Sequence, residues 1–463
     1  MPGRFFTYIR IVFYEIQSMK IIIAGDGETG THLARMLSVE NQDIVLIGEN
    51  REHLAELDAE GNFITSEGRP TSAAALERCG VGSADLFVAV TPDENTNIVA
   101  CELAREIGAA KCAARVDSPE FTDGVSLATL RRHGVDLAIC PEKLAAGEIS
   151  QFICHNWASQ WFPLRRGELL VAGVRMEPGG ELCGKTLRDI PSNPRLFHVA
   201  AIRRGSAIII PRGDDSLLAG DTIYFVVRPE DTGILPRLCG RREIPVRRIM
   251  ISGGGRVTEN LLEIIAGGHY NITVIDPDRE RCHAIASRFP RVVAVNAAAS
   301  DVLTLKEEGI EKCDIFLALT GSSETNIVSC MVAREHGAPR TLARIEELEY
   351  IPEAESLSID KIINKKLINA GSILNAILES DRATSQCVSL ENAEIAGITV
   401  REGSKIVSKP IAGLSLPKGI TVGGLIRDGR GQIVEGRTRV EPGDHVVVFC
   451  VAGTLPKVQR YFS

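Results

Sequence analysis

The strongest constraint on the fold of this 463-residue chain is an internal repeat. The segment Lys20–Gly30, with the sequence KIIIAGDGETG, is matched much later by Arg248–Thr258, with the sequence RIMISGGGRVT. The segments that follow also match in order and composition. They are Asp43–Gly48 with Asn271–Asp276, Ala84–Thr91 with Cys313–Thr320, Thr96–Cys101 with Thr325–Cys330, and Ala114–Val116 with Ala343–Ile345. The repeat predicts one structural unit present twice.

Each copy begins with buried runs of Ile and Val that alternate with stretches of helical period. In the first copy these stretches are residues 30–40, 50–59, 71–80 and 95–107. Such alternation predicts a parallel sheet with helices on both faces. Each copy ends in a shorter, strand-rich segment with Gly, Pro and Asp turns. We therefore predict an α/β chain with two large, doubly wound N-lobes, each followed by a small α+β C-lobe.

The expected division of the chain has seven parts. They are an extension over residues 1–18, a first N-lobe over 19–140, a connecting helix over 141–165, a first C-lobe over 166–232, a second N-lobe over 247–369, a connecting helix over 370–385, and a second C-lobe over 386–460. The extension is broken by Arg10 and Glu15. We interpret it as an upstream start or a disordered extension, with a membrane-surface segment as the alternative.

The two connecting segments carry apolar residues at helical spacing. The first stripe is Leu144, Ile149, Phe152, Ile153, Trp157 and Trp161, and the second is Ile363, Leu367, Ile368, Leu374, Ile377 and Leu378. Such stripes usually pack into a core. A subunit interface is the other interpretation, because the chain's two tryptophans both lie in the first segment.

Composition excludes several classes of function. Charged residues make up 24% of the chain, apolar residues make up 44%, and a net charge of −8 argues against nucleic acid as a partner. No apolar run approaches the roughly 20 residues that a membrane-spanning helix needs. The 12 cysteines are scattered without a C-x-x-C pair, so we expect mostly buried thiols in a reducing cytosol and no metal site.

Three glycines of the first copy form a dinucleotide-binding fingerprint. Gly25, Gly27 and Gly30 follow a predicted strand and open a predicted helix. The first glycine permits a tight turn, the second lets the backbone approach a pyrophosphate, and the third allows close packing of helix and strand. Amides at the start of the helix can then bind phosphate.

The two copies lack different parts of this fingerprint. An acid that binds ribose is expected at the end of the second strand, where the first copy has Gly48, followed by Glu49. The second copy has Asp276 at this position but Thr258 in place of the third glycine, with Arg256 in the turn. We expect both clefts to bind nucleotide with unequal affinity. The alternative for the second copy is a vestigial, empty cleft.

Further candidates follow the fourth and fifth strands of each copy. Thr91 and Thr320 end the fourth strands, at the edge where doubly wound sheets bind ligands. Arg115 and Arg344 end the fifth strands, where a guanidinium can bind phosphate oxygens or form a structural salt bridge. The Thr-Asn pairs at 96–97 and 325–326 are interpreted as helix caps or packing.

With these motifs, the chain resembles the TrkA family, whose members are built from tandem regulator-of-potassium-conductance (RCK) domains. Each domain has a Rossmann-like N-lobe and a small C-lobe, and the likeness extends from about residue 19 to the C-terminus. It implies nucleotide contacts in both copies. The contacts are Gly25, Asp26, Gly27, Glu28, Thr29, Gly30, Thr91, Pro92 and Arg115 in the first copy, with Glu49 as a further candidate, and Gly253, Gly255, Arg256, Val257, Thr258, Asp276, Thr320 and Arg344 in the second. The sequence departs from the family pattern at Gly48, at Thr258, and after the third strands, at residues 68–70 and 296–298.

The resemblance also implies a function. The expected protein is a cytosolic regulatory subunit, peripheral on the inner face of the cell membrane, that binds NAD or NADH, with ATP or ADP as further ligands. Its partners would be a membrane-embedded Trk-type potassium transporter and other copies of itself in a ring, expected to be a tetramer. The alternatives are an NAD(P)-dependent oxidoreductase and a soluble regulator of another channel or antiporter. His198 and His445 do not form a catalytic arrangement that would favour the oxidoreductase.

Overall fold

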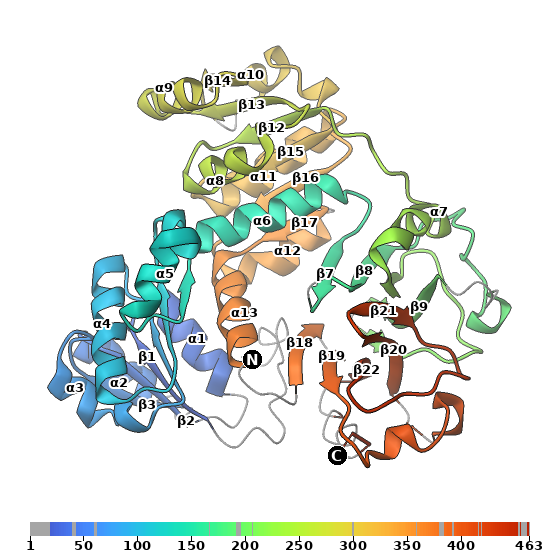
Figure 1. The fold of residues 1–463 in the computed structure, drawn as a ribbon. Coiled ribbons are helices and arrows are strands. Elements are labelled where there is room, and N and C mark those ends of the chain that lie inside the picture. The colour runs from blue at the N-terminus through green and yellow to red at the C-terminus, as the bar shows by residue number, and fades with distance from the viewer. Residues whose placement is uncertain are drawn as a thin grey trace. The chain divides into compact units, whose positions relative to one another are not determined.

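The structure is a computed structural model whose described part divides into two compact units (Figure 1). One unit contains both N-lobes, from residue 19 to Cys154 and from Ile244 to Ile373, and the other contains both C-lobes, His155–Glu243 and the residues from Leu374 onward. The interpretations of residues 1–18 lie outside the described residues. The described residues are 19–38, 43–59, 63–165, 167–190, 196–205, 207–298, 301–357, 359–378, 384–390, 393–414, 416–417, 419–451, 454 and 461–462.

The first N-lobe is a six-stranded parallel sheet in the order β3-β2-β1-β4-β5-β6. Its strands are runs of Ile, Val, Leu and Ala, as expected where both faces are covered. They are β1 (Lys20–Ala24), β2 (Asp43–Gly48), β3 (Ile64–Glu67), β4 (Leu86–Ala89), β5 (Cys112–Arg115) and β6 (Leu137–Ile139). The helices are α1 (Glu28–Ser38), α2 (Arg51–Asp58), α3 (Ala73–Arg78), α4 (Glu94–Ile107) and α5 (Gly124–Arg132).

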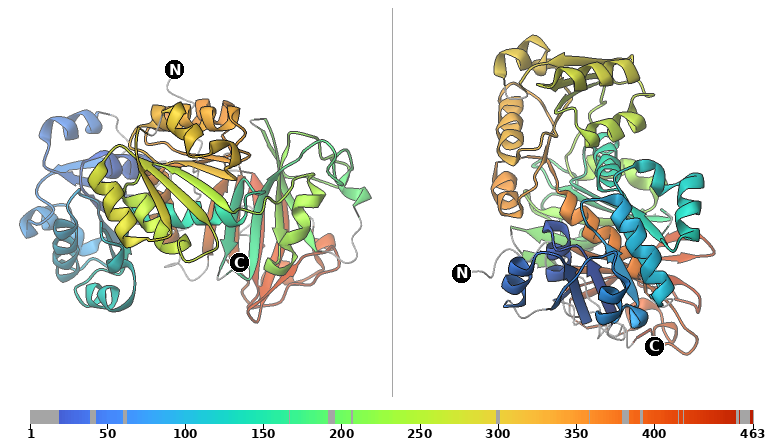
Figure 2. Two further views of the ribbon diagram at one scale, coloured as in Figure 1. Left: turned by 90° about the horizontal axis from the view of Figure 1, so that it is seen from above. Right: turned by 90° about the vertical axis from the view of Figure 1, so that its left-hand side faces the viewer.

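The second N-lobe repeats this order as β14-β13-β12-β15-β16-β17, also parallel. Figure 2 shows helices on both faces of its sheet. Its strands are β12 (Arg248–Ser252), β13 (Asn271–Asp276), β14 (Val292–Asn296), β15 (Ile315–Ala318), β16 (Thr341–Arg344) and β17 (Lys361–Ile363). Its helices are α8 (Arg256–Ile265), α9 (Arg279–Arg288), α10 (Val302–Glu307), α11 (Ser323–Glu335) and α12 (Ile351–Ser356). The predicted pair of doubly wound sheets is confirmed.

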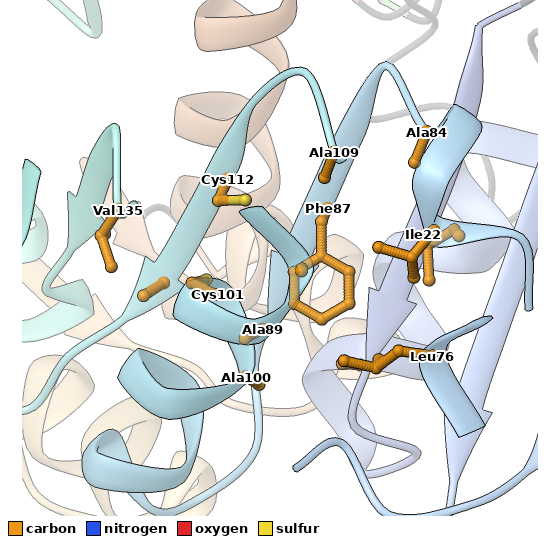
Figure 3. Close-up of a cluster of buried hydrophobic side chains, with 14 of the residues drawn as sticks. Ile22, Leu76, Ala84, Phe87, Ala89, Ala100, Cys101, Ala109, Cys112 and Val135 are labelled. Atoms are coloured by element: carbon orange, nitrogen blue, oxygen red, sulfur yellow. The ribbon is translucent and has the colours of Figure 1, made fainter. Parts of the chain in front are cut away.

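One face of the first sheet packs against α3 and α4 around Phe87 of β4 (Figure 3). Ile22 of β1 and Leu76 of α3 belong to the same buried cluster. Cys101 and Cys112 are buried there too, and burial raises the pKa of the Cys101 thiol. Most of the cysteines in the described part of the chain are buried, as the sequence predicted.

The first connecting helix, α6 (Pro141–Cys154), completes the core of the second N-lobe. Ile149, Phe152 and Ile153 of α6 pack with Leu261 and Ile265 of α8 in one buried cluster. This confirms the core-packing interpretation for these residues.

The prediction that α6 continues to residue 165 is wrong. The helix ends at Cys154, and Trp161 lies in strand β7 (Gln160–Leu164) of the other unit. Trp157 is buried in the core of the first C-lobe, and the ring of His155 stacks on Trp161 with centroids 3.8 Å apart. Pro163 is compatible with β7 because this strand is at the edge of its sheet.

The second connecting helix, α13 (Lys365–Leu378), begins five residues before the predicted position 370. Ile363, which was placed in its apolar stripe, lies in β17. Ile368 packs against the same cluster as α6. The side chains of Leu374, Ile377 and Leu378 lie outside the described residues.

Each C-lobe is built on a five-stranded antiparallel sheet, and the orders are β10-β9-β11-β8-β7 and β18-β19-β22-β20-β21. The inner faces of the two sheets share one buried cluster, which contains Tyr224 and Phe449. The remaining strands are β8 (Leu169–Arg175), β9 (Phe197–Arg204), β10 (Ala207–Ile209), β11 (Thr222–Val227), β18 (Thr384–Leu390), β19 (Ala393–Thr399), β20 (Ile420–Arg427), β21 (Arg430–Ile433) and β22 (His445–Val451), and the short helix α7 spans Leu235–Leu238.

Equivalent ion pairs recur in the two C-lobes. The Arg204 guanidinium donates to both carboxylate oxygens of Asp221, and Arg427 does the same to Asp444 at 2.7 Å for each bond. Both carboxylates are buried. The two histidines considered above also pack inside this unit. His198 lies 3.1 Å from the Thr421 hydroxyl, and burial lowers the pKa of His445 to about 4.

Within the described ranges, no helix is long and apolar enough to span a bilayer.

Candidate functional site

The glycine loop of the first copy lies between the carboxyl ends of β1, β2 and β4. The Gly25 amide donates to the carbonyl of Ile47 at 2.9 Å, and the residue has a φ of 126°, which favours glycine. A Cβ on Gly25 would lie 3.0 Å from the amide nitrogen of Thr91, and one on Gly30 would lie 1.8 Å from the carbonyl oxygen of Gly25. A Cβ on Gly27 would meet no atom within 4 Å. Gly25 and Gly30 therefore pack the loop, and Gly27 leaves its outer side open.

The second copy builds the same loop with a threonine in the third position. Gly253 has a φ of 103° and donates to the carbonyl of Ile275 at 2.8 Å. Thr258 is buried, and its hydroxyl donates to the carbonyl of Gly253 at 2.6 Å. A Cβ on Gly255 would meet no atom within 4 Å. In the first copy, Gly30 packs directly against the carbonyl of Gly25. In the second copy, the Thr258 hydroxyl forms a hydrogen bond with the equivalent carbonyl, that of Gly253.

A buried asparagine in each copy ties the fourth strand to the fifth. The Asn97 side-chain oxygen accepts from the Thr91 amide at 2.8 Å and from its hydroxyl at 2.7 Å, and the side-chain nitrogen donates to the carbonyl of Arg115 at 2.9 Å. Asn326 repeats these bonds with Thr320 and Arg344 at 3.0, 2.7 and 2.7 Å. The Thr-Asn pairs therefore provide packing, and the helix caps are the side chains of Asp93 and Ser322 instead. The sequence contains one indication of this role, which is that the Thr-Asn pair is identical in both copies.

The two candidate arginines lie at the ends of their strands, each paired with an acid two residues later. A terminal nitrogen of Arg115 lies 3.1 Å from Oδ1 of Asp117, and Arg344 pairs with Glu346. The side chains of both arginines are largely buried, and each forms the salt bridge of the second interpretation. An incoming phosphate would have to compete with these carboxylates.

Asp117 also contacts the second copy. A terminal nitrogen of Arg256, in the second glycine loop, lies 3.0 Å from Oδ2 of Asp117, and this bond raises the pKa of the guanidinium. The equivalent residue of the first loop, Glu28, pairs instead with Lys366 of α13 at 2.6 Å. Sequence reasoning missed Asp117 because its partner is distant in the chain.

The acid at the end of the second strand is present in the second copy. Oδ2 of Asp276 accepts from the Gly254 amide at 2.6 Å, and Oδ1 accepts from the Asp278 amide at 2.8 Å. A terminal nitrogen of Arg281 lies 3.2 Å from Oδ2. Sequence reasoning did not identify Arg281, which lies in the first turn of α9. Only 2% of Asp276 is exposed.

The first copy is arranged differently at this point. The Glu49 side chain is 60% exposed and pairs with Arg69 at 3.3 Å. The carboxylate beside Gly48 is that of Asp26, from the glycine loop, and its Oδ2 accepts from the Asn50 amide at 2.8 Å. The structure therefore brings Asp26, and not Glu49, to the end of β2.

A cavity of about 490 Å³ lies in the second cleft. Its lining combines five of the predicted residues, which are Gly253, Gly255, Asp276, Thr320 and Arg344, and adds Arg281. The volume is within the range of pockets that bind small molecules, roughly 300–1,000 Å³. Val257 and Thr258 are buried behind the loop and can offer only backbone atoms to a ligand.

In the first cleft, Glu28 and Pro92 are exposed, and Thr29 is half-buried in the first turn of α1. Each cleft thus combines a glycine loop at a helix start, a carboxylate near the second strand, and an arginine at the fifth. In the described part of the chain, no group of three or more His, Cys, Asp or Glu side chains is placed to hold a metal ion.

Family models match both copies along most of the chain. The TrkA-N domain matches residues 21–141 and 249–365, and the TrkA-C domain matches residues 171–233 and 395–463. Trk system potassium uptake protein TrkA homolog 1 of Methanosarcina mazei is 31% identical over 453 residues, which are 96% of this chain and 100% of that protein. Trk system potassium uptake protein TrkA of Halomonas elongata is 31% identical over 454 residues, which are 96% and 99% of the two chains.

Solved structures show the same fold. The crystal structure of the GsuK RCK domain has a TM-score of 0.62 at 16% identity, covering 98% of this chain and 97% of that one. The GsuK channel bound to NAD has a TM-score of 0.63 at 16% identity, covering 98% and 80%. The sequence relatives are named as potassium uptake proteins and not as enzymes. The chain belongs to the TrkA family of Trk system potassium uptake proteins.

Proposed function

We propose that this protein is a cytoplasmic, nucleotide-binding regulatory subunit of a Trk-type potassium uptake system. Its ligand would be NAD or NADH, with ATP or ADP as alternatives, and its partner a membrane-embedded potassium transporter that holds it at the inner face of the cell membrane. The observation that carries the proposal is the second cleft, where a glycine loop, the Asp276 carboxylate and the Arg344 guanidinium line one cavity. A similar fold in a channel bound to NAD supports the choice of ligand.

The cleft offers complementary groups to each part of a nucleotide. The amides at the start of α8 and the partial positive charge of its N-terminus favour a diphosphate beside Gly255. Asp276 can accept hydrogen bonds from ribose hydroxyls, and Arg344 can exchange Glu346 for a phosphate oxygen. Asn326 bonds to the Thr320 amide and to the backbone carbonyl of Arg344, which supports a site whose strand ends are joined before the ligand binds.

Regulation requires two states with different affinity for the ligand. We propose that the chains assemble into a ring, as a tetramer, and that nucleotide in the N-lobe clefts shifts the relative positions of domains in the ring. The ion pairs of Arg115 and Arg344 are the groups that a ligand of different charge would disturb. NAD, NADH, ADP and ATP differ in charge at the phosphates or at the nicotinamide, so they can favour different states.

The test uses two matched substitutions. A Cβ at Gly27 or at Gly255 meets no atom within 4 Å, so a larger side chain can begin at either position without a clash at its first atom. Gly27→Trp should abolish nucleotide binding at the first cleft, and Gly255→Trp at the second, with binding measured by calorimetry. Potassium flux is then measured through the partner transporter reconstituted with each variant. Flux that responds to no nucleotide, although the wild-type protein binds it, would contradict the regulatory proposal.

A further inference from the structure

The end of the second strand differs between the two copies in a reciprocal way. The first copy has Asp26 in its glycine loop and Gly48 at the end of β2, whereas the second has Gly254 in the loop and Asp276 at the strand end. An aspartate and a glycine have thus exchanged places between two facing positions. We propose that Asp26 is the ribose-binding carboxylate of the first cleft and gives that cleft its preference for an unphosphorylated ribose. This inference rests on the proposed function, since it names a specificity residue of the same site.

The two carboxylates hold equivalent backbone groups. Asp26 accepts from the amide of Asn50, two residues beyond Gly48 and the N-cap of α2. Asp276 accepts from the amide of Asp278, two residues beyond its own position and the N-cap of α9. Both bonds are 2.8 Å long. A carboxylate therefore occupies the same place relative to the strand and the following helix, although it comes from the loop in one copy and from the strand in the other.

In the first copy the space admits only one side chain. A Cβ on Gly48 would lie 2.2–2.4 Å from atoms of the Asp26 side chain, a distance that real Cβ atoms do not reach. In the second copy a Cβ on Gly254 would lie 2.8 Å from Cδ1 of Ile285 and 3.4 Å from Oδ2 of Asp276. The aspartate opposite Gly48 thus explains the glycine in the first copy, whereas in the second copy the close contact at Gly254 is with Ile285 and the Asp276 carboxylate lies at van der Waals distance. The first copy thus carries its aspartate in the glycine loop, at Asp26, and not at the end of β2, where it has Gly48.

The Asp26 carboxylate has more hydrogen-bonding capacity left for a ligand than Asp276. Asp276 receives the Gly254 and Asp278 amides and the Arg281 guanidinium. Among the described residues, Asp26 receives the Asn50 amide alone. The position equivalent to Arg281 is His53, whose ring lies 3.4 Å from the Thr31 hydroxyl. In the part of the chain that the structure describes, the first cleft therefore presents a half-buried carboxylate with no guanidinium bonded to it.

This chemistry defines the class of ligand. A carboxylate accepts hydrogen bonds from the two hydroxyls of a ribose and repels a phosphate on the 2′ oxygen. An arginine near the carboxylate, as in the second cleft, can accommodate such a phosphate. The first cleft should therefore discriminate against NADP more strongly than the second does.

The experiment isolates the first cleft in the full chain. In a Gly255→Trp background, which blocks the second cleft, the affinities for NAD and NADP are measured by calorimetry. We expect tighter binding of NAD than of NADP. Asp26→Asn should weaken NAD binding by about tenfold, as loss of a hydrogen bond to a charged group does. The same substitution should lower the ratio of NAD to NADP affinity, because the repulsion of the 2′-phosphate is removed.

The reciprocal double variant is the decisive control. Asp26→Gly with Gly48→Asp recreates the arrangement of the second copy and should restore the affinity for NAD and the preference over NADP. Gly48→Asp alone should lose binding, because two carboxylates compete for one space. Thermal unfolding of every variant, and second-cleft binding of the same variants without Gly255→Trp, report whether the fold is intact.

The outcomes separate the inference from the proposed function. If the first cleft binds NAD but Asp26→Asn changes neither the affinity nor the NADP ratio, Asp26 does not contact the ribose and the inference is overturned. If the Gly255→Trp protein binds no nucleotide while Gly27→Trp still does, the first cleft is not a site, and the proposed function fails for that copy together with the inference.

Discussion

Among substitutions at residues that do not contact the ligand, replacing Asn326 should destabilise the second cleft most. It is fully buried in α11, and its side-chain oxygen and nitrogen make four hydrogen bonds with Thr320 and Arg344. Asn326→Ala leaves these backbone groups and the threonine hydroxyl without their partner. At about 1 kcal/mol for each net hydrogen bond, the loss should be about 3–4 kcal/mol in local stability.

Hydrogen exchange followed by mass spectrometry locates this loss, because it reports the opening free energy of individual segments. Protection should fall in β15, β16 and the start of α11, with little change in the first N-lobe. Nucleotide affinity at the second cleft should fall with it, since Thr320 and Arg344 lose their common support. Val328→Ala, at a half-exposed position of the same helix, is the matched control and should change stability by less than about 0.5 kcal/mol.

Asn97→Ala makes the same change in the first copy, so the loss of protection should move to β4 and β5. A loss below about 1 kcal/mol for Asn326→Ala, or a loss spread evenly over both N-lobes, would show that the asparagine does not hold the strand ends together.

Three further predictions concern single side chains. Asp276→Ala should weaken nucleotide binding at the second cleft by about 1–2 kcal/mol, measured by calorimetry in a Gly27→Trp background, and unchanged affinity would show that the ribose lies elsewhere. Asp444→Asn should destabilise the C-lobe unit by about 2–3 kcal/mol, because it breaks the buried pair with Arg427. The fluorescence of Trp157 and Trp161, which both belong to this unit, measures the effect. Arg437→Gln, at an exposed arginine that pairs with Glu435, should have almost no effect. Finally, the folded-state pKa of His445 is about 4, below its ordinary value of 6.5, so the stability it contributes is complete above pH 6.5 and is lost as the pH falls toward 4. His445→Gln should flatten that slope, and an unchanged slope would assign it to other groups.

The sequence determined the features of this protein that depend on short stretches of chain. The alternation of apolar strands and helices predicted both sheets, since this pattern reflects burial on two faces. The positions of Gly25 and Gly253 followed from the glycine motifs, because a tight turn with positive φ is a local property. The ends of β5 and β16 at Arg115 and Arg344 followed from the same local pattern.

Only the tertiary structure decided which distant residues meet. The Asp26 carboxylate lies beside Gly48 because the glycine loop meets the end of β2, and no rule of spacing connects these positions. Arg256 lies against Asp117 because α6 of one copy packs on α8 of the other. Trp161 has helical spacing in the sequence, but it lies in a strand because β8 offers backbone partners for pairing. Local periodicity carries no record of such partners, so these contacts appear only when the chain is folded.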